Sequence, residues 1–148
     1  MSATKLGWRE WLVLPQLGIA AIRAKIDTGA RSSALHVETL ETVHADGIEV
    51  AQFSLRTGAD DHEIHCRAPV FDRRPVTDSG GHTTERVFIR TELELAGQRW
   101  PIEINLANRR NMLFPMLLGR TAMGGRFLID PARSFVLGDR DLPNGPAA

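Results

Sequence analysis

The residues best suited to chemistry in this sequence are Asp27, Thr28 and Gly29, which directly follow a stretch that alternates apolar with basic residues. That stretch, 20–26, is typical of a half-buried β-strand, so the triplet is expected at a strand end. Gly29 allows a sharp turn, Thr28 offers a hydroxyl that can lock it, and backbone N–H groups can hold the Asp27 carboxylate. Such a carboxylate could act as a general base, although turns that begin with Asp are also common without any catalytic role.

A second motif lies far downstream, where Leu117 and Leu118 lead into Gly119 and Arg120. In aspartic peptidases an Asp-Thr-Gly loop lies beside a strand that ends in two apolar residues and a glycine, and a short helix follows. The two motifs of this sequence resemble the retropepsin pattern, including the arginine after the second glycine. The alternative is an ordinary core strand that ends at a turn.

The resemblance extends to one bacterial family through the stretches 25–36, 114–120 and 126–134. These stretches resemble retropepsin-like aspartic proteases that are named ATP-dependent zinc proteases and are often encoded near ATP-grasp glutamate ligases. The resemblance implies a closed, single-lobed acid-protease barrel over residues 1–141, and we expect a disordered tail over 142–148. Because the sequence holds neither a Walker loop for ATP nor a His-Glu-x-x-His helix for zinc, no cofactor and no metal site are expected.

The resemblance also assigns roles to residues. Only one credible catalytic carboxylate is present, so the family mechanism implies a homodimer in which the Asp27 side chains of two subunits meet, with Thr28 and Gly29 in the catalytic loop. The polar segment 72–85 is expected to form a flap over a peptide or protein substrate. The residues expected to contact substrate are Ala30, Arg31, Gly80, Gly81 and Arg120.

Arg31 departs from the viral pattern. Viral retropepsins place an aspartate after Asp-Thr-Gly-Ala, where it pairs with the arginine after the second glycine, and here that position is Arg31. A more basic substrate-facing floor would favour acidic peptides or a C-terminal carboxylate. The alternative is that Arg31 pairs with a local acidic residue and has a structural role.

Two other clusters invite different interpretations. Asp78-Ser79-Gly80 could act as a second catalytic triplet with 135–138 as its apolar partner, but each lobe would then be too small to bury a core. His62, His65 and Cys66 are potential zinc ligands. On a strand, however, the two histidines would point to opposite faces, so we favour a solvated strand end, although other histidines could be brought near by folding.

The elements that must position these residues are nearly all β. We expect one helical turn at 120–123, hairpin turns at 46–47 and 96–98, and strands at 8–14, 18–26, 36–43, 48–55, 63–71, 87–95, 99–106, 116–118, 127–129 and 134–137. Many short strands with regular turns are typical of an all-β barrel or sandwich. The last strand, 134–137, is a candidate element of the dimer interface.

Composition narrows the function classes. The 148 residues include 18 basic and 18 acidic side chains, so no net charge favours nucleic acid or an anionic membrane. We expect a cytoplasmic protein, because no secretory signal or membrane-spanning run is evident and Cys66 is the single cysteine. Two alternatives to the aspartic endopeptidase stay open: a non-catalytic dimeric module that binds peptides or proteins, and a zinc-dependent peptidase.

Overall fold

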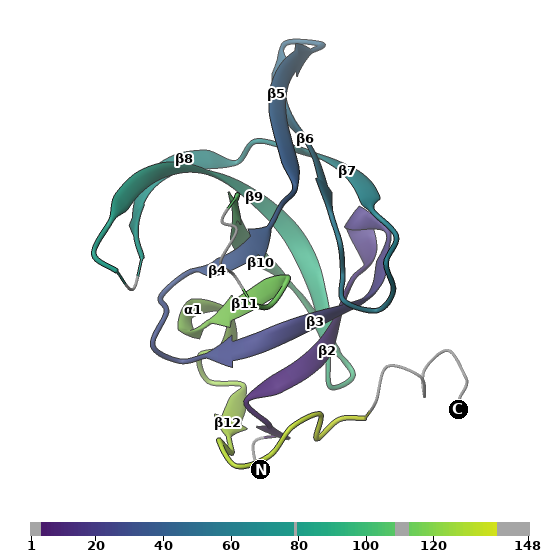
Figure 1. Ribbon diagram of the computed structural model, residues 1–148, viewed down its shortest axis with the longest axis vertical. Helices are drawn as coiled ribbons and strands as arrows, with labels where there is room; N and C mark the ends of the chain where they lie inside the picture. Colours follow the sequence, from purple (N-terminus) through teal and green to yellow (C-terminus); the bar gives the residue numbers. More distant parts are fainter. Residues whose placement is uncertain (1–3, 79, 109–112, 139–148) are drawn as a thin grey trace.

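The computed structural model describes residues 4–78, 80–108 and 113–138, and the tail expected at 142–148 lies outside them. The protein is mostly β with one short α-helix, as the sequence predicts (Figure 1). The elements, in chain order, are β1 Thr4–Leu6, β2 Arg9–Leu14, the 3₁₀-helix η1 Pro15–Leu17, β3 Ile19–Asp27, β4 Ser33–His36, β5 Thr39–Ala45, β6 Ile48–Leu55, β7 Ile64–Pro69, β8 Asp72–Thr77, β9 Thr83–Leu95, β10 Gln98–Ala107, β11 Met116–Gly119, α1 Arg120–Met123 and β12 Phe127–Ile129.

The central sheet has seven strands in the order β10-β4-β11-β3-β2-β9-β8, and β10 also pairs with β9. The strand pairing therefore returns to its starting point through β10, β4, β11, β3, β2 and β9. A three-stranded sheet, β5-β6-β7, and a two-stranded sheet, β1-β12, complete the fold. The β5–β6 hairpin projects from one end of the molecule, and β12 lies at the other (Figure 1). The described part of the chain holds no helix with the length and apolarity that a membrane span requires.

Both predicted hairpin turns are confirmed. Asp46 and Gly47 have φ values of 55° and 79°, and Ala96 and Gly97 have φ values of 56° and 74°. Two consecutive residues with positive φ form the turn whose twist matches that of paired strands. The second turn is tighter than the three residues predicted, because Gln98 already pairs with Leu95.

The sequence predicts a polar stretch between strands at 72–85, and most of this segment instead belongs to β8 and the start of β9. These two strands pair antiparallel down to Thr77 and Thr83, whose hydroxyl oxygens lie 2.7 Å apart. Val76 and the threonines are β-branched and fit a pleated surface well. Because the segment is rich in polar residues, its composition did not indicate this hairpin.

The predicted strand at 134–137 is wrong. Its backbone N–H groups bond elsewhere: Val136 and Leu137 donate to the Glu10 carboxylate at 3.0 and 3.3 Å, and Phe135 donates to the Arg9 carbonyl at 2.9 Å. Phe135 also has a φ of 51°, outside the strand region, and its ring stacks on Trp11. Residues 134–137 therefore run along β2 without forming a β-ladder with it.

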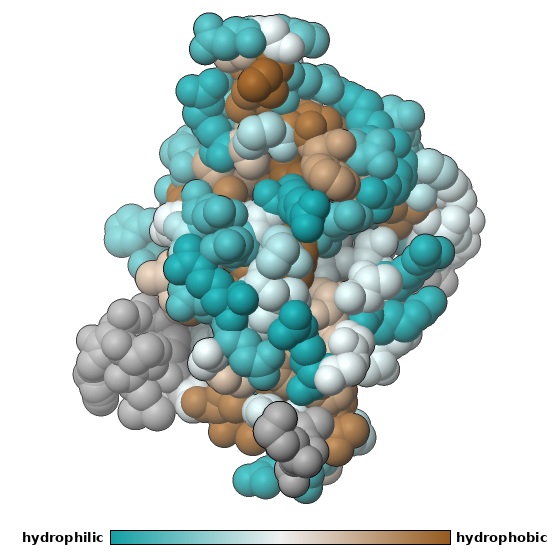
Figure 2. All heavy atoms as spheres, turned by 180° about the vertical axis from the view of Figure 1, so that it is seen from behind, coloured by the Kyte–Doolittle hydropathy of each residue, from teal (hydrophilic) through white to brown (hydrophobic). Residues whose placement is uncertain are grey.

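Glu10 holds residues 134–137 from inside the protein. Its side chain is fully buried and accepts a third hydrogen bond from the Gly7 N–H at 2.6 Å. The hydrophobic core draws side chains from most strands and includes Leu6, Leu12, Leu14, Ile19, Ile22, Leu35, Leu93, Ile104 and Leu118. At the β1–β12 end, hydrophobic side chains gather on the face seen in Figure 2, and Leu128 of β12 is 57% exposed.

We expect Glu10→Gln to lower the free energy of unfolding by about 2–4 kcal/mol, because the amide nitrogen of glutamine cannot accept an N–H group as the second carboxylate oxygen does. That change corresponds to a fall in Tm of about 5–10 °C for a chain of this size. Thermal unfolding followed by circular dichroism would measure it. Glu41→Gln, at an exposed position on β5, is the control and should leave Tm unchanged. Equal Tm values for the two variants would contradict the role given to Glu10.

Candidate active site

The Asp27 side chain lies at the end of β3, beside the end of β11. The two strands run parallel, and their register places Gly119 opposite Asp27. The Asp27 carboxylate is half-buried, and its Oδ1 accepts hydrogen bonds from the N–H groups of Gly29 at 3.0 Å and Ala30 at 3.2 Å. The loop thus turns back on its own carboxylate, as the Asp27-Thr28-Gly29 triplet predicts.

Gly119 allows two distant parts of the chain to cross. A Cβ atom at this position would lie 2.6 Å from the Ser32 carbonyl carbon and 2.9 Å from the Arg31 carbonyl oxygen, so only glycine fits without movement of the backbone. The Gly119 N–H donates to the buried Ser33 hydroxyl at 3.0 Å. The loop after Asp27 is therefore locked against the end of β11 by contact and by hydrogen bonding.

Helix α1 also holds this loop. The Arg120 N–H donates to the Ala30 carbonyl at 2.8 Å, and its guanidinium donates to the Gly29 carbonyl at 3.2 Å. Thr121 binds the Arg31 carbonyl through its N–H at 3.3 Å and its hydroxyl at 2.7 Å. The Arg120 guanidinium thus supports the loop in this structure, and its contact with substrate stays a prediction.

The remaining predicted residues lie in two places. Thr28 and Gly29 are exposed at the tip of the Asp27 loop. Gly80 and Gly81 lie in the turn between β8 and β9, and Gly81 has a φ of 84°. Figure 1 shows this hairpin arching outward and ending, in that view, on the same side of the molecule as the loop after β3.

Asp78 serves the turn of this hairpin. Its Oδ1 accepts the N–H groups of Gly80 at 2.9 Å and His82 at 3.0 Å. No apolar strand lies beside it among the described residues, because the proposed partner 135–138 packs along β2. The alternative of a two-lobed chain with Asp78 as a second catalytic residue therefore lacks the necessary strand pairing.

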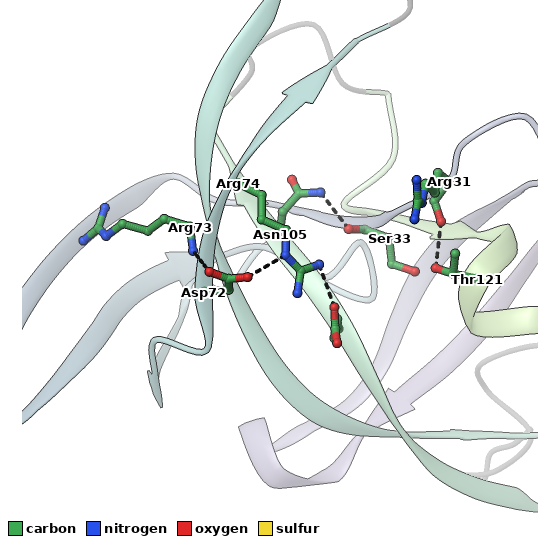
Figure 3. Close-up of polar contacts among 8 residues, drawn as sticks. Arg31, Ser33, Asp72, Arg73, Arg74, Asn105 and Thr121 are labelled. Carbon is green, nitrogen blue, oxygen red and sulfur yellow. Dashed lines mark hydrogen bonds and ion pairs between the residues drawn. The ribbon is translucent and has the colours of Figure 1, made fainter.

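A cavity of about 460 Å³ adjoins the Asp27 loop. Its charged lining consists of four arginines and one carboxylate: Arg31, Arg74, Arg90, Arg126 and Glu103. Arg31 approaches from the Asp27 loop and Arg74 from β8 (Figure 3). Within the described residues the Arg31 guanidinium has no carboxylate at ion-pair distance, so the alternative in which it pairs with a local acid is not observed.

Arg74 differs from Arg31 because it is held on several sides. Asp72 accepts its Nε–H and Glu103 accepts its Nη1–H, both at 2.7 Å (Figure 3). Its guanidinium also lies 4.6 Å from the centre of the Phe88 ring. The hydrogen bond from Arg74 lowers the pKa of Asp72, and the bonds from Asp72 and Glu103 raise the pKa of Arg74.

Sequence reasoning missed Arg74, Arg90, Glu103 and Arg126 as parts of this cavity. They come from β8, β9, β10 and the turn after α1, and only the strand register brings them together. Arg126 lies 4.2 Å from the centre of the Trp100 ring. The one available signal was a high frequency of arginine in the polar segments, which says nothing about which arginines meet.

The residues considered as zinc ligands are separated. His62 precedes β7 and is exposed, His65 is exposed on β7, and Cys66 is buried with its thiol directed at the Leu17 carbonyl. Among residues 4–78, 80–108 and 113–138, no group of three or more His, Cys, Asp and Glu side chains could hold a metal ion. Burial raises the pKa of the Cys66 thiol to about 11, which disfavours the thiolate that binds metals.

Comparison with known proteins gives a family match and relatives with a different printed name. The family model for the retropepsin-like aspartic endopeptidase RimB matches residues 5–140. A protein of Desulfotalea psychrophila named probable alpha-L-glutamate ligase is 41% identical over 136 residues, which are 90% of this chain and 29% of that protein. A protein of Parasynechococcus marenigrum with the same name is 40% identical, with 90% of this chain and 29% of that protein covered. The chain thus spans less than a third of the length of these relatives.

Among solved structures, protein Lpg0085 of Legionella pneumophila, described as of unknown function, resembles this chain with a TM-score of 0.72 and 27% identity. The match covers 91% of this chain and 98% of that one. The likeness therefore extends over nearly the whole of both chains.

We expect Gly119→Ala to destabilise the protein by about 2 kcal/mol or more, because the new methyl group would force the Arg31–Ser32 backbone away from β11. Gly124→Ala is a matched control, because a Cβ there would meet only the Arg120 carbonyl oxygen at 3.6 Å. Urea unfolding of both variants would measure the effect. A Gly119→Ala protein as stable as Gly124→Ala would show that the crossing tolerates a side chain.

We expect Cys66 to react with an aromatic disulfide reagent about 100-fold more slowly at pH 8 in the folded protein than in urea, because the pKa of about 11 leaves little thiolate. The buried neutral thiol stabilises the fold below the ordinary thiol pKa of 9.0, and this contribution is lost as the pH rises toward about 11. Release of the coloured thiolate measures the rate. Similar rates in both conditions would mean that the thiol is accessible.

Proposed function

We propose, from the premise that this chain belongs to the RimB-like family of retropepsin-like aspartic endopeptidases, that it hydrolyses peptide bonds with an Asp dyad formed across a homodimer. One observation carries the proposal. Asp27 ends β3 opposite Gly119 of β11, and its carboxylate is held by the N–H groups of Gly29 and Ala30. A simple turn would not need two segments about 90 residues apart to pair beside it. A catalytic loop needs such support, because its carboxylate must keep a fixed position.

The mechanism needs two carboxylates that share one proton. One acts as general base on a water molecule, and the other, protonated, polarises the scissile carbonyl. Like charges about 3 Å apart cannot both ionise, so the two protonation steps occur at separated pH values that belong to the pair. Each chain supplies Asp27, and the partner's copy completes the dyad. The exposure of Thr28 and Gly29 at the loop tip is consistent with a surface that meets a second subunit.

The fold fits this role. The circuit of pairings through β10, β4, β11, β3, β2 and β9 supports a closed acid-protease barrel of one lobe. The β8–β9 hairpin is the flap in this proposal, and Gly80 and Gly81 give its turn the freedom to close over substrate. The dimer contact in this proposal includes the exposed Thr28–Gly29 loop tip, because the two Asp27 side chains must meet there.

The proposed substrate is an acidic peptide. The cavity beside the Asp27 loop carries four guanidinium groups against one carboxylate, and guanidinium binds carboxylate through paired N–H donors. The relatives named glutamate ligases contain a segment similar to this chain, which favours glutamate-rich peptides among acidic ones. We place the enzyme in the cytoplasm, where a buried free thiol such as Cys66 is the ordinary state.

Asp27→Asn should abolish peptidase activity and leave the fold intact, because the amide keeps the shape of the side chain but cannot act as base. If wild-type and Asp27→Asn chains are unfolded together in equal amounts and refolded at random, about a quarter of the dimers carry two carboxylates. Activity against an acidic peptide should then fall to about a quarter of that measured for the same total amount of refolded wild-type protein.

An activity that falls linearly with the wild-type fraction would contradict the shared site, since each chain would then hold a complete one. Activity that is lost in EDTA and restored by zinc would support the zinc peptidase instead. A wild-type protein that binds acidic peptides without cleaving them would support the non-catalytic binding module.

A further inference from the structure

Glu103 is the carboxylate of the arginine-lined cavity. The other charged side chains of the lining are Arg31, Arg74, Arg90 and Arg126. We infer that Glu103 is a specificity-determining residue that occupies Arg74 in the free protein, and that an acidic side chain of the substrate displaces it. This inference rests on the proposed function, because it concerns how the same enzyme selects acidic peptides.

The contacts of Glu103 suit a displaceable group. Its Oε1 accepts the Arg74 Nη1–H at 2.7 Å, and the two side chains are 41% and 38% exposed. Water and other anions can therefore reach the pair, and exposed ion pairs of this kind are weak. Glu103 also stands directly across from Arg90 in the β9–β10 pairing, so its charge offsets a second arginine of the cavity.

Asp72 has the complementary role of holding Arg74 in place. It accepts the Arg74 Nε–H at 2.7 Å but does not line the cavity. The Arg74 guanidinium also stacks on Phe88, at 4.6 Å from the ring centre. If Glu103 moved away, Asp72 and Phe88 would keep the guanidinium oriented, with its Nη1–H directed at the cavity. One carboxylate thus positions the arginine, and the other occupies the site that a substrate carboxylate would take.

The pair also joins two structural parts. Arg74 lies on β8, in the hairpin proposed as the flap, and Glu103 lies on β10 in the body of the sheet. Displacement of Glu103 by a substrate carboxylate exchanges a contact between flap and body for a contact between flap and substrate. Recognition of an acidic side chain and the position of the flap would then depend on the same guanidinium.

A purely structural role for Glu103 predicts a different change in peptide binding. If Glu103 only braced β8, its loss would loosen the flap and weaken the binding of acidic and neutral peptides alike. If Glu103 competes with substrate, its loss tightens the binding of acidic peptides alone. Glu94→Gln is the matched control, because Glu94 is 42% exposed, pairs with Arg99 and lies outside the cavity.

The test uses the full chain carrying Asp27→Asn, so that no peptide is cleaved, with and without E103Q or E94Q. Fluorescein-labelled hexaglutamate and hexaglutamine are titrated and followed by fluorescence anisotropy. We expect E103Q to lower the Kd for hexaglutamate by about fivefold, as loss of an exposed competing pair would, and to leave hexaglutamine unchanged. Circular dichroism confirms that each variant is folded.

Unchanged or weaker hexaglutamate binding by E103Q would overturn the inference, as would an equal gain in E94Q, which would indicate a general effect of charge. Absence of hexaglutamate binding in every variant would also overturn it. Failure of the proposed function would give a different result. Wild-type chains would then cleave no peptide, but E103Q would still tighten hexaglutamate binding selectively.

Discussion

The close approach of Gly119 to the backbone of Arg31 and Ser32 is the constraint on which the rest of the site depends. It allows β11 to lie between β3 and β4, parallel to one and antiparallel to the other. The end of β3, and with it Asp27, is thereby held by a strand about 90 residues away. Helix α1 begins immediately after the crossing, so its first N–H groups reach the carbonyls of the same loop.

The charged side chains near the site have two separate roles. Some hold the local structure, and others stay accessible to a ligand. Arg120 is turned onto the Gly29 carbonyl, and Asp72 is turned onto Arg74, so both ions support local geometry. Arg31 keeps its backbone fixed by Thr121 while its guanidinium has no carboxylate partner in the described part of the chain. Because the backbone is already fixed, binding an anion would require ordering of the Arg31 side chain alone.

The sequence predicted features whose causes are local or carried by a motif. The Asp46-Gly47 turn follows from residues that tolerate positive φ, and the Asp27 and Gly119 loops follow from two motifs in a known order. The role of Glu10 could not be predicted, because its three donors come from residues 7 and 136–137 and no local pattern joins them. The arginine cavity was missed for the same reason: strand register decides which side chains face one another.

The placement of Glu10 has a mechanical consequence. One carboxylate binds residue 7 near the beginning of the described chain and residues 136–137 near its end, and both lie at the β12 end of the molecule (Figure 1). A pulling force applied between the two ends of the described chain would load this junction together with the β1–β12 pairing before it loaded β3 or β11. The strands that carry Asp27 are therefore shielded from tension at the ends of the described chain.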